Sequence, residues 1–336
     1  MRLGGRQHAV SCSACGGVIA LKPGAVAKLT RHVRGETIML KEKARAQLAK
    51  KPGFIAALDQ SGGSTPGALK AYGIAATAYS GEDEMFELVH AMRVRIIGAP
   101  AFTGDKVLAA ILFERTMDGE ADGKPVPTYL WEDRGVVPLL KVDKGLTDEH
   151  DGVQVMKPIP GLDDLLARAV KLGIYGTKMR SVIKLASRGG IADVVDQQFG
   201  IAAQIAKHGL IPIIEPEVSI KSPDKGGAEA LLLEEIQKRL DAGPNGFRVM
   251  LKLTIPNEAN LYAPLSKQGR VVRVVALSGG YTRDEACARL SRNKDMIASF
   301  SRALVEDLTY QMSDAEFDKS LGHSIDEIFK ASTVKV

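Results

Sequence analysis

The amino-acid sequence predicts an α/β protein, a single (β/α)8 TIM barrel with an additional C-terminal helix. Eight short apolar runs of strand-forming residues recur between residues 53 and 301, and amphipathic helical patterns separate most of them. Alternating strands and helices predict a parallel sheet, and eight such units predict its closure into a barrel. The main alternative is a doubly wound open sheet, but no GxGxxG motif follows the first run.

Each expected strand is rich in Val, Ile, Leu and Ala, as strands buried on both faces are. In chain order the strands cover residues 53–59, 106–116, 135–145, 175–184, 209–218, 248–255, 271–280 and 296–301. The helical patterns cover residues 82–95, 161–172, 190–208, 226–241, 283–293 and 303–311. A last helix is expected after Ser313, because Ser313 and Glu316 have the spacing of a capping box. The apolar face of this helix consists of Phe317, Leu321, Ile325 and Ile328.

The N-terminal residues differ in charge from the rest of the chain. Residues 1–35 contain six Lys or Arg and no Asp or Glu, whereas the remainder has a formal charge of −1. We therefore expect a basic extension at 1–38, disordered or not native to the protein, and one barrel domain at 39–336. A basic, acid-free segment also has the composition of an organelle signal. The nearly neutral barrel lacks the general basic surface of a nucleic-acid-binding protein.

Composition limits the class of protein further. The chain of 336 residues is 45% hydrophobic and 25% charged, which is typical of a globular protein. No apolar run reaches about 18 residues, so no membrane span is predicted. Three cysteines indicate a reducing compartment, and we expect a cytoplasmic protein. Cys12 and Cys15 form a lone CxxC, and no two histidines have ligand spacing, so neither a metal nor a cofactor is predicted.

Polar side chains gather near the carboxyl ends of the expected strands. Three strands carry pairs that are two residues apart, a spacing that places both side chains on the same side of a strand. These pairs are Lys141 and Asp143, Lys178 and Arg180, and Glu215 and Glu217. Other strands end with or contain Asp59, Glu114, Lys252, Ser278-Gly279-Gly280 and Arg302. At the carboxyl-terminal mouth of a barrel, where barrel enzymes hold their active sites, these groups would converge. The alternatives are that charged residues mark solvated strand ends, or that they form structural ion pairs such as Lys252 with Glu215.

Lys252 lies inside the apolar run VMLKLTI. Burial of an isolated ammonium is costly and lowers the pKa of the amine, so we expect a neutral nucleophile near pH 7. A neutral amine attacks a ketone or aldehyde carbon to give a Schiff base, an electron sink that permits carbon–carbon cleavage without a metal. Carboxylates must move protons in such a reaction. Glu215 or Glu217 suits imine formation, and Asp59 suits removal of a hydroxyl proton.

The stretch ALSGGYTRDEA suggests a site for phosphate. Ser278, Gly279 and Gly280 follow the seventh strand, and a helix is expected to begin near Thr282. Glycines let backbone amides approach an anion, and a helix N-terminus favours negative charge. Arg302, after the eighth strand, would add a charged contact. The alternative is an ordinary glycine-rich turn.

Several motifs together resemble class I fructose-bisphosphate aldolase in its shorter bacterial form, from about Met39 to the end. They are GFIAALDQSGGSTPGALKAYGI, LKVDKGL, GTKMRSVI, GLIPIIEPEV, VMLKLTIP, RVVALSGGYTRDEA and IASFSRAL. The resemblance implies a metal-independent lyase that reversibly cleaves fructose 1,6-bisphosphate to dihydroxyacetone phosphate and glyceraldehyde 3-phosphate in glycolysis and gluconeogenesis. The expected partner is this sugar bisphosphate, with no nucleic acid and no membrane, and a homo-oligomer is left open.

The resemblance also implies a role for each matching residue. Lys252 would form the Schiff base, Glu215 would transfer protons in imine formation, and Asp59 would take the C4 hydroxyl proton. Lys178 would stabilise charge in the intermediates. The site would be lined by Lys141, Arg180, Glu217 and Ser61. The C1 phosphate would be held by Ser278, Gly279, Gly280 and Arg302.

Three features depart from the animal enzymes of this family. Thr65-Pro66-Gly67-Ala68 replaces their basic residues, so Lys141 or Arg180 is expected to contribute more to the second phosphate site. The chain ends in STVKV rather than in a tyrosine, and the extension 1–38 has no counterpart in the short bacterial form. The alternatives are another Schiff-base barrel enzyme, of the transaldolase or deoxyribose-phosphate aldolase type, or a non-catalytic sugar-phosphate binding protein.

Overall fold

The computed structural model describes residues 9–11, 18–20, 41–61 and 65–336. The chain divides into two compact units, Met1–Gln47 and Leu48–Val336. In the first unit, β1 (Ala9–Ser11) pairs antiparallel with β2 (Val18–Ala20). The rest of the predicted extension lies outside the described residues, and so does the CxxC motif of Cys12 and Cys15.

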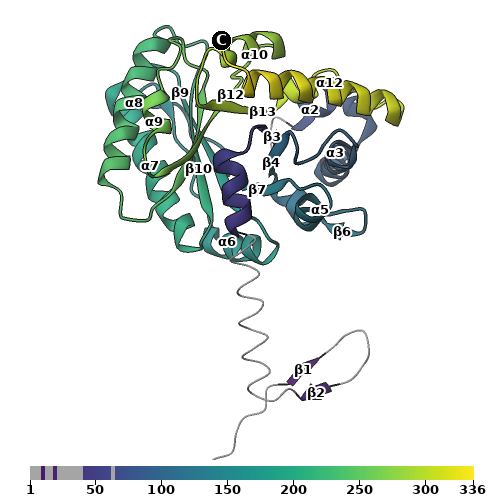
Figure 1. Ribbon diagram of the computed structural model, residues 1–336. Coiled ribbons are helices and arrows are strands. Elements are labelled where there is room, and N and C mark those ends of the chain that lie inside the picture. Colours follow the sequence, from purple (N-terminus) through teal and green to yellow (C-terminus); the bar gives the residue numbers. More distant parts are fainter. Residues whose placement is uncertain (1–8, 12–17, 21–40, 62–64) are drawn as a thin grey trace, which may run out of the picture. The chain divides into compact units, whose positions relative to one another are not determined.

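A closed parallel barrel forms the centre of the second unit, as predicted (Figure 1). Its strands are β3 (Phe54–Leu58), β4 (Val107–Leu112), β7 (Val137–Lys141), β9 (Gly176–Ile183), β10 (Ile211–Val218), β11 (Val249–Thr254), β12 (Val271–Leu277) and β13 (Met296–Phe300). Each strand pairs in parallel with the next one listed here, and β13 pairs with β3 to close the barrel. A short strand, β8 (Val153–Gln154), adds to β9 in antiparallel orientation.

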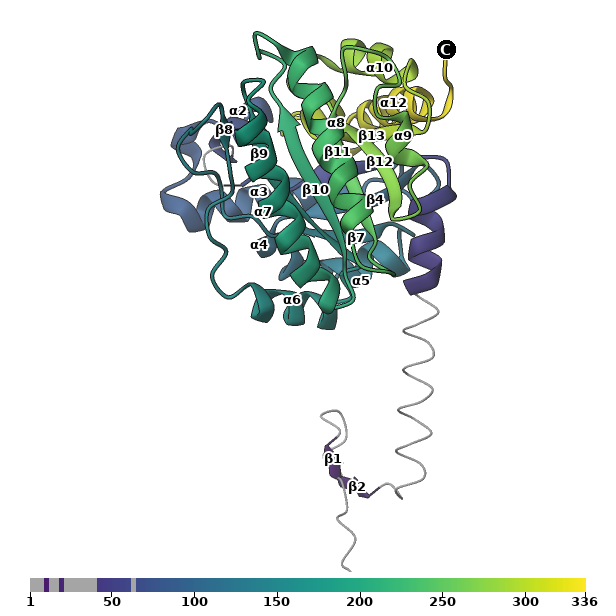
Figure 2. The same ribbon diagram turned by 90° about the vertical axis from the view of Figure 1, so that its left-hand side faces the viewer.

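Helices cover the outside of the barrel, and Figure 2 shows α7 and α8 lying over strands β9 to β11. The longer helices are α3 (Gly81–Gly98), α6 (Leu162–Lys171), α7 (Arg188–Lys207), α8 (Lys225–Ala242), α10 (Arg283–Ser291) and α12 (Asp314–Thr333). The shorter elements are α2 (Thr65–Ala71), η2 (Ala76–Ala78), α4 (Glu114–Met117), β5 (Glu120–Ala121), β6 (Lys124–Pro125), α5 (Val126–Glu132), α9 (Ala263–Ser266) and α11 (Arg302–Val305). Within the described residues, no helix is both long and apolar enough to cross a bilayer.

The C-terminal helix begins where the sequence predicts. The Ser313 side chain accepts a hydrogen bond from the Glu316 backbone, and the Glu316 carboxylate accepts one from the Ser313 backbone, which completes the capping box. The predicted apolar face, Phe317, Leu321, Ile325 and Ile328, is buried. By contrast, the helix predicted at 303–311 ends at Val305. Residues 306–311 form turns and irregular backbone, and the Tyr310 backbone N–H donates to the Tyr72 carbonyl at 2.7 Å.

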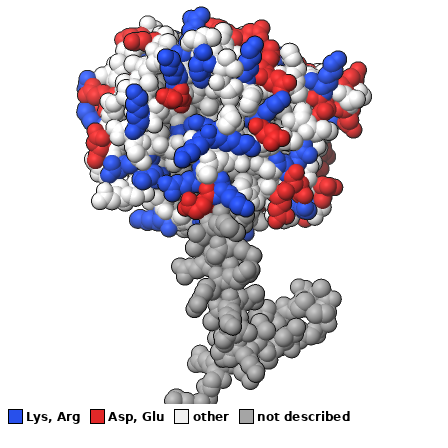
Figure 3. All heavy atoms as spheres, viewed as in Figure 1, with Lys and Arg blue, Asp and Glu red and all other residues white. Residues whose placement is uncertain are grey.

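The two faces of the barrel strands have different roles. Phe54, Ala56 and Leu58 of β3 pack in the apolar core beneath the helices. Side chains alternate along a strand, so Ala57 and Asp59 face the interior and line a cavity there. On the outer face drawn in Figure 3, basic and acidic side chains are interspersed, with a short row of basic ones at its centre. This mixture agrees with the nearly neutral charge of residues 36–336.

Candidate active site

A cavity of about 280 Å³ opens at the carboxyl ends of the strands. Every predicted site residue except Gly280 contributes to its lining. These residues are Asp59, Ser61, Lys141, Lys178, Arg180, Glu215, Glu217, Lys252, Ser278, Gly279 and Arg302. Gly280 lies next to this cavity and, with Arg302, lines a neighbouring one.

Strand register explains why the charged pairs meet. Lys141 of β7 pairs with Lys178 of β9, and Arg180 of β9 pairs with Glu215 of β10. Paired residues on neighbouring strands project to the same face, so all four side chains enter the barrel interior. The alternate residue Met179 packs in the outer core.

Glu215 joins two lysines at the bottom of the cavity. Its Oε1 lies 3.0 Å from Lys252 Nζ, and its Oε2 lies 3.0 Å from Lys178 Nζ. All three side chains are buried. The ion pair that was the structural alternative for Lys252 is thus present. The same contact also places a carboxylate next to the amine, which is the arrangement that the predicted proton transfer requires. The neutral form of Lys252 stays a prediction.

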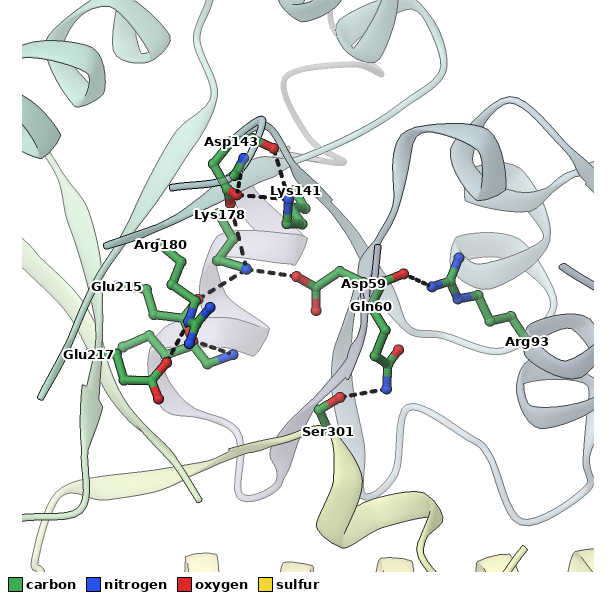
Figure 4. Close-up of polar contacts among 12 residues, drawn as sticks. Asp59, Gln60, Arg93, Lys141, Asp143, Lys178, Arg180, Glu215, Glu217 and Ser301 are labelled. Carbon is green, nitrogen blue, oxygen red and sulfur yellow. Dashed lines mark hydrogen bonds and ion pairs between the residues drawn. The ribbon is translucent and has the colours of Figure 1, made fainter. Parts of the chain in front are cut away.

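Lys178 is the centre of the buried charge network (Figure 4). Its Nζ lies 2.7 Å from Asp59 Oδ2 and 3.9 Å from Asp143 Oδ2, in addition to the Glu215 contact. Burial alone would lower the pKa of Lys178, but the charges of these carboxylates outweigh burial and raise that pKa above its ordinary value. Lys178 is therefore a permanent cation at neutral pH, suited to stabilise negative charge.

The same network keeps Asp59 ionised. Burial alone would raise the pKa of Asp59, but the charges of Lys178, Lys252 and Lys141 lower it to about 2. A carboxylate that remains ionised at neutral pH has the protonation state that a proton acceptor requires.

Asp143 was noted in the sequence but was not assigned to the site. Its Oδ1 and its carbonyl oxygen each lie 2.8 Å from Lys141 Nζ, and its side chain is buried. The spacing of two residues from Lys141 was the available signal. Asp143 holds Lys141 in place while its second oxygen faces Lys178.

Arg180 and Glu217 form a pair at a more exposed level of the cavity. Arg180 Nε donates to Glu217 Oε2, and 41% of the Arg180 side chain is exposed. Burial alone would lower the pKa of Arg180, but the Glu217 charge and hydrogen bond raise it. A cation at this level is accessible to an anionic substrate group.

The Ser278–Gly280 turn requires glycine at two positions. Gly279 has φ of 64° and Gly280 has φ of 112°, values that favour glycine. A Cβ atom at Gly279 would also lie 2.8 Å from Ile220 Cγ2. Thr282 then caps the N-terminus of α10 by accepting from the Glu285 backbone N–H. Backbone amides, a helix N-terminus and Arg302 thus occur together at this edge of the barrel.

Sequence reasoning missed several neutral residues of the cavity, including Gln60, Ser299 and Ser301. Gln60 Nε2 donates to Ser301 Oγ at 2.6 Å, which links the ends of β3 and β13. The spacing of two between Ser299 and Ser301 at a strand end was the only signal for the serines. Glu114, by contrast, begins α4 and pairs with Lys144 and Arg168, so it serves as a surface ion-pair residue.

The barrel and its cavity define a class of enzyme. A buried amine contacts a carboxylate, a cation and an ionised aspartate lie beside them, and a glycine turn, a helix N-terminus and Arg302 lie at the rim. These are the groups of a Schiff-base aldolase.

Comparison with known proteins gives the family. The family model described as "Glycolytic: Fructose-bisphosphate aldolase class-I" matches residues 40–225. The chain therefore belongs to the class I fructose-bisphosphate aldolase family.

Similar proteins support this assignment. Fructose-bisphosphate aldolase class 1 of Synechocystis sp. is 58% identical over 298 residues, which cover 88% of this chain and 99% of that protein. The protein of the same name from Porphyromonas gingivalis is 54% identical over 286 residues, or 85% of this chain and 97% of that protein. Fructose-bisphosphate aldolase from Plasmodium falciparum superimposes with a TM-score of 0.69 at 19% identity, covering 89% of this chain and 96% of that chain. This last likeness supports the fold alone.

Proposed function

We propose that the chain reversibly cleaves fructose 1,6-bisphosphate to dihydroxyacetone phosphate and glyceraldehyde 3-phosphate through a Schiff base on Lys252. The observation that carries the proposal is the 3.0 Å contact between Lys252 Nζ and Glu215 Oε1 inside a buried cavity. The reaction is inferred from the family membership. Its first step is assigned to Lys252 and Glu215 because their side chains are in contact.

Imine formation comes first. Lys252 Nζ attacks the C2 carbonyl of the ketose, and Glu215 donates a proton to the departing hydroxyl as water leaves. Glu215 contacts both the Lys252 amine and the Lys178 cation, each at 3.0 Å. The protonated imine then withdraws electrons from the neighbouring bonds.

Carbon–carbon cleavage follows. Asp59 takes the proton of the C4 hydroxyl, the C3–C4 bond breaks, and its electron pair moves into the imine to give an enamine. Glyceraldehyde 3-phosphate departs as the aldehyde. Protonation of C3 and attack of water on the imine carbon then release dihydroxyacetone phosphate and restore the Lys252 amine.

The phosphates are assigned to the two charged edges of the cavity. Ser278, Gly279, Gly280 and Arg302 hold the C1 phosphate in this proposal. Lys141 and Arg180 are the cations available to the second phosphate, and Ser61 and Glu217 complete the lining. The cations match the charge of a bisphosphate, which supports a substrate with two phosphate groups.

Borohydride trapping tests the covalent step. We expect reduction in the presence of dihydroxyacetone phosphate to attach the triose to the peptide that contains Lys252. Lys252→Arg retains a hydrogen-bond donor for Glu215 but removes the primary amine, so it should abolish the adduct. The matched variant Lys141→Arg, in the same cavity, should retain it. Activity should be unchanged in EDTA. An adduct mapped to Lys178, or no adduct in the wild-type protein, would refute the assignment.

We further propose that residues 39–336 form the catalytic unit and that the protein is cytoplasmic. The start of the family match at residue 40 and the occurrence of the relatives in bacteria support these two points. A variant that consists of residues 39–336 should retain full turnover. Loss of turnover in that variant would show that residues 1–38 are required for catalysis.

A further inference from the structure

Arg93 is a buried cation behind Asp59. It belongs to α3, in the helix layer, and its side chain is 1% exposed. Figure 4 shows it reaching from the helix toward the chain that follows Asp59 at the end of β3. Arg93 does not line the cavity, and the proposed function gives it no role.

The hydrogen-bond partners of Arg93 among the described residues are neutral. Its NH1 donates to Thr116 Oγ1 at 2.8 Å, and its NH2 donates to the Gln60 carbonyl oxygen. Its Nε has no hydrogen-bond partner among the described residues. Burial lowers the pKa of Arg93 to about 10, and the charge of Asp59 opposes this effect. Asp59 is thus a carboxylate whose charge stabilises the Arg93 cation across the end of β3.

Packing alone does not account for a cation in this position. A buried charge that lacks a contacting counter-ion is costly, and an apolar side chain such as methionine would pack there without that cost. Buried charges with perturbed pKa values gather at functional sites. The geometry here gives a specific reason, because Gln60, whose carbonyl Arg93 holds, directly follows Asp59.

Gln60 is held from two sides. Arg93 holds its carbonyl from α3, and Ser301 Oγ accepts from its Nε2 at 2.6 Å from the end of β13. These two contacts hold the backbone carbonyl and the side chain of Gln60, and Gln60 is the residue that directly follows Asp59. Asp59 Oδ2 lies 2.7 Å from Lys178 Nζ. The orientation of the Asp59 carboxylate about this contact determines where its other oxygen, Oδ1, points.

We infer that Arg93 is a positioning residue for Asp59. By fixing the Gln60 carbonyl and supplying charge behind the carboxylate, it keeps Asp59 oriented to accept the C4 hydroxyl proton during cleavage. This inference rests on the proposed function, because it assumes the role of Asp59. It concerns the cleavage step and not imine formation, which depends on Lys252 and Glu215.

Two rates separate these steps. Cleavage turnover of fructose 1,6-bisphosphate requires proton removal by Asp59. Borohydride trapping of dihydroxyacetone phosphate on Lys252 requires only imine formation. We expect Arg93→Met to lower the turnover number for cleavage at least about 10-fold, as loss of an aligned base does. The trapping rate per folded molecule should stay within about twofold of the wild-type rate.

Two further variants serve as controls. Arg93→Lys keeps a cation and should restore part of the cleavage rate. Thr116→Val removes the other hydrogen-bond acceptor of the same guanidinium but leaves the charge and the Gln60 contact, so it should retain both rates. Circular dichroism would give the folded fraction of each variant.

The inference is overturned if Arg93→Met cleaves at the wild-type rate. It is also overturned if this variant loses cleavage and trapping in parallel, since a purely structural residue would behave in that way. Asp59→Asn separates this failure from that of the proposed function. If Asp59→Asn cleaves normally, the role of Asp59 itself is wrong. If Asp59→Asn is inactive while Arg93→Met is not, only the inference about Arg93 fails.

Discussion

Lys178→Met removes the cation shared by the carboxylates of the site while keeping a side chain of similar length. In the wild-type protein, Lys178 Nζ lies 2.7 Å from Asp59 Oδ2 and 3.0 Å from Glu215 Oε2. A pKa of about 2 for Asp59 in place of an ordinary value near 4 favours its ionised form by about 2.5 kcal/mol. Loss of one partner of a buried ion pair costs about 3–5 kcal/mol, so we expect the variant to be less stable by about that amount at neutral pH.

The pH dependence distinguishes this electrostatic cause from a packing defect. The pKa of Asp59 is depressed in the folded protein, so its contribution to stability is complete above the unfolded value of about 4. That contribution is lost as the pH falls from about 4 to about 2. In the variant, burial of Asp59 is no longer offset by Lys178, and its pKa should rise above the unfolded value. The variant then gains stability as the pH falls toward about 4, and its deficit shrinks.

Thermal denaturation of both proteins between about pH 4 and pH 8 measures this difference. Lys141→Met is the matched control, because Lys141 also lines the cavity, with 12% of its side chain exposed, and its ion pair is with Asp143 alone among the described residues. It should show a smaller deficit than Lys178→Met. The view that Lys178 holds Asp59 ionised would be refuted by either of two results. One is a loss of stability in Lys178→Met that does not change with pH, and the other is a loss no larger than that in Lys141→Met.

Three further predictions concern other parts of the barrel. Glu215→Gln should slow trapping of dihydroxyacetone phosphate on Lys252 by about 10²-fold or more, because it removes the proton-transferring group; a rate near that of the wild type would exclude Glu215 from imine formation. Gly279→Ala should raise the KM for phosphorylated substrates and lower the melting temperature, because its Cβ would lie 2.8 Å from Ile220 Cγ2 at φ of 64°; steady-state kinetics showing neither change would contradict the cradle geometry. Ser313→Ala removes the cap of α12 and should cost about 1 kcal/mol in a denaturant titration without a change in turnover, whereas an unchanged midpoint would show that the cap is dispensable.

The strands were predictable because the barrel buries them on both faces. Each strand of the closed sheet is an apolar run in the sequence, and the helices between the strands show the hydrophobic period of a surface helix. Elements of one or two turns could not be predicted in this way. The helices α4, α5 and α9 are between four and seven residues long, which is too short for a helical period to emerge. The helix α11 ends after one turn, and Tyr310 beyond it bonds to Tyr72, a long-range contact that no local pattern reveals.

The candidate site was predictable where a charge interrupts an apolar strand. Lys178 and Lys252 stand out for this reason, and both lie in the cavity. Gln60 and Ser301 are neutral residues in polar stretches, so nothing distinguishes them from ordinary loop residues. Arg93 lies in a helix that carries many charges, and its burial depends on how that helix packs against the barrel, which the sequence pattern of α3 does not specify.

A crystal structure of the protein soaked with dihydroxyacetone phosphate would test the central claim most directly. We predict continuous electron density between Lys252 Nζ and C2 of the triose, with a Glu215 oxygen within hydrogen-bond distance of the new bond. Density for an intact, unbonded triose, or a covalent bond to Lys178 instead, would contradict it.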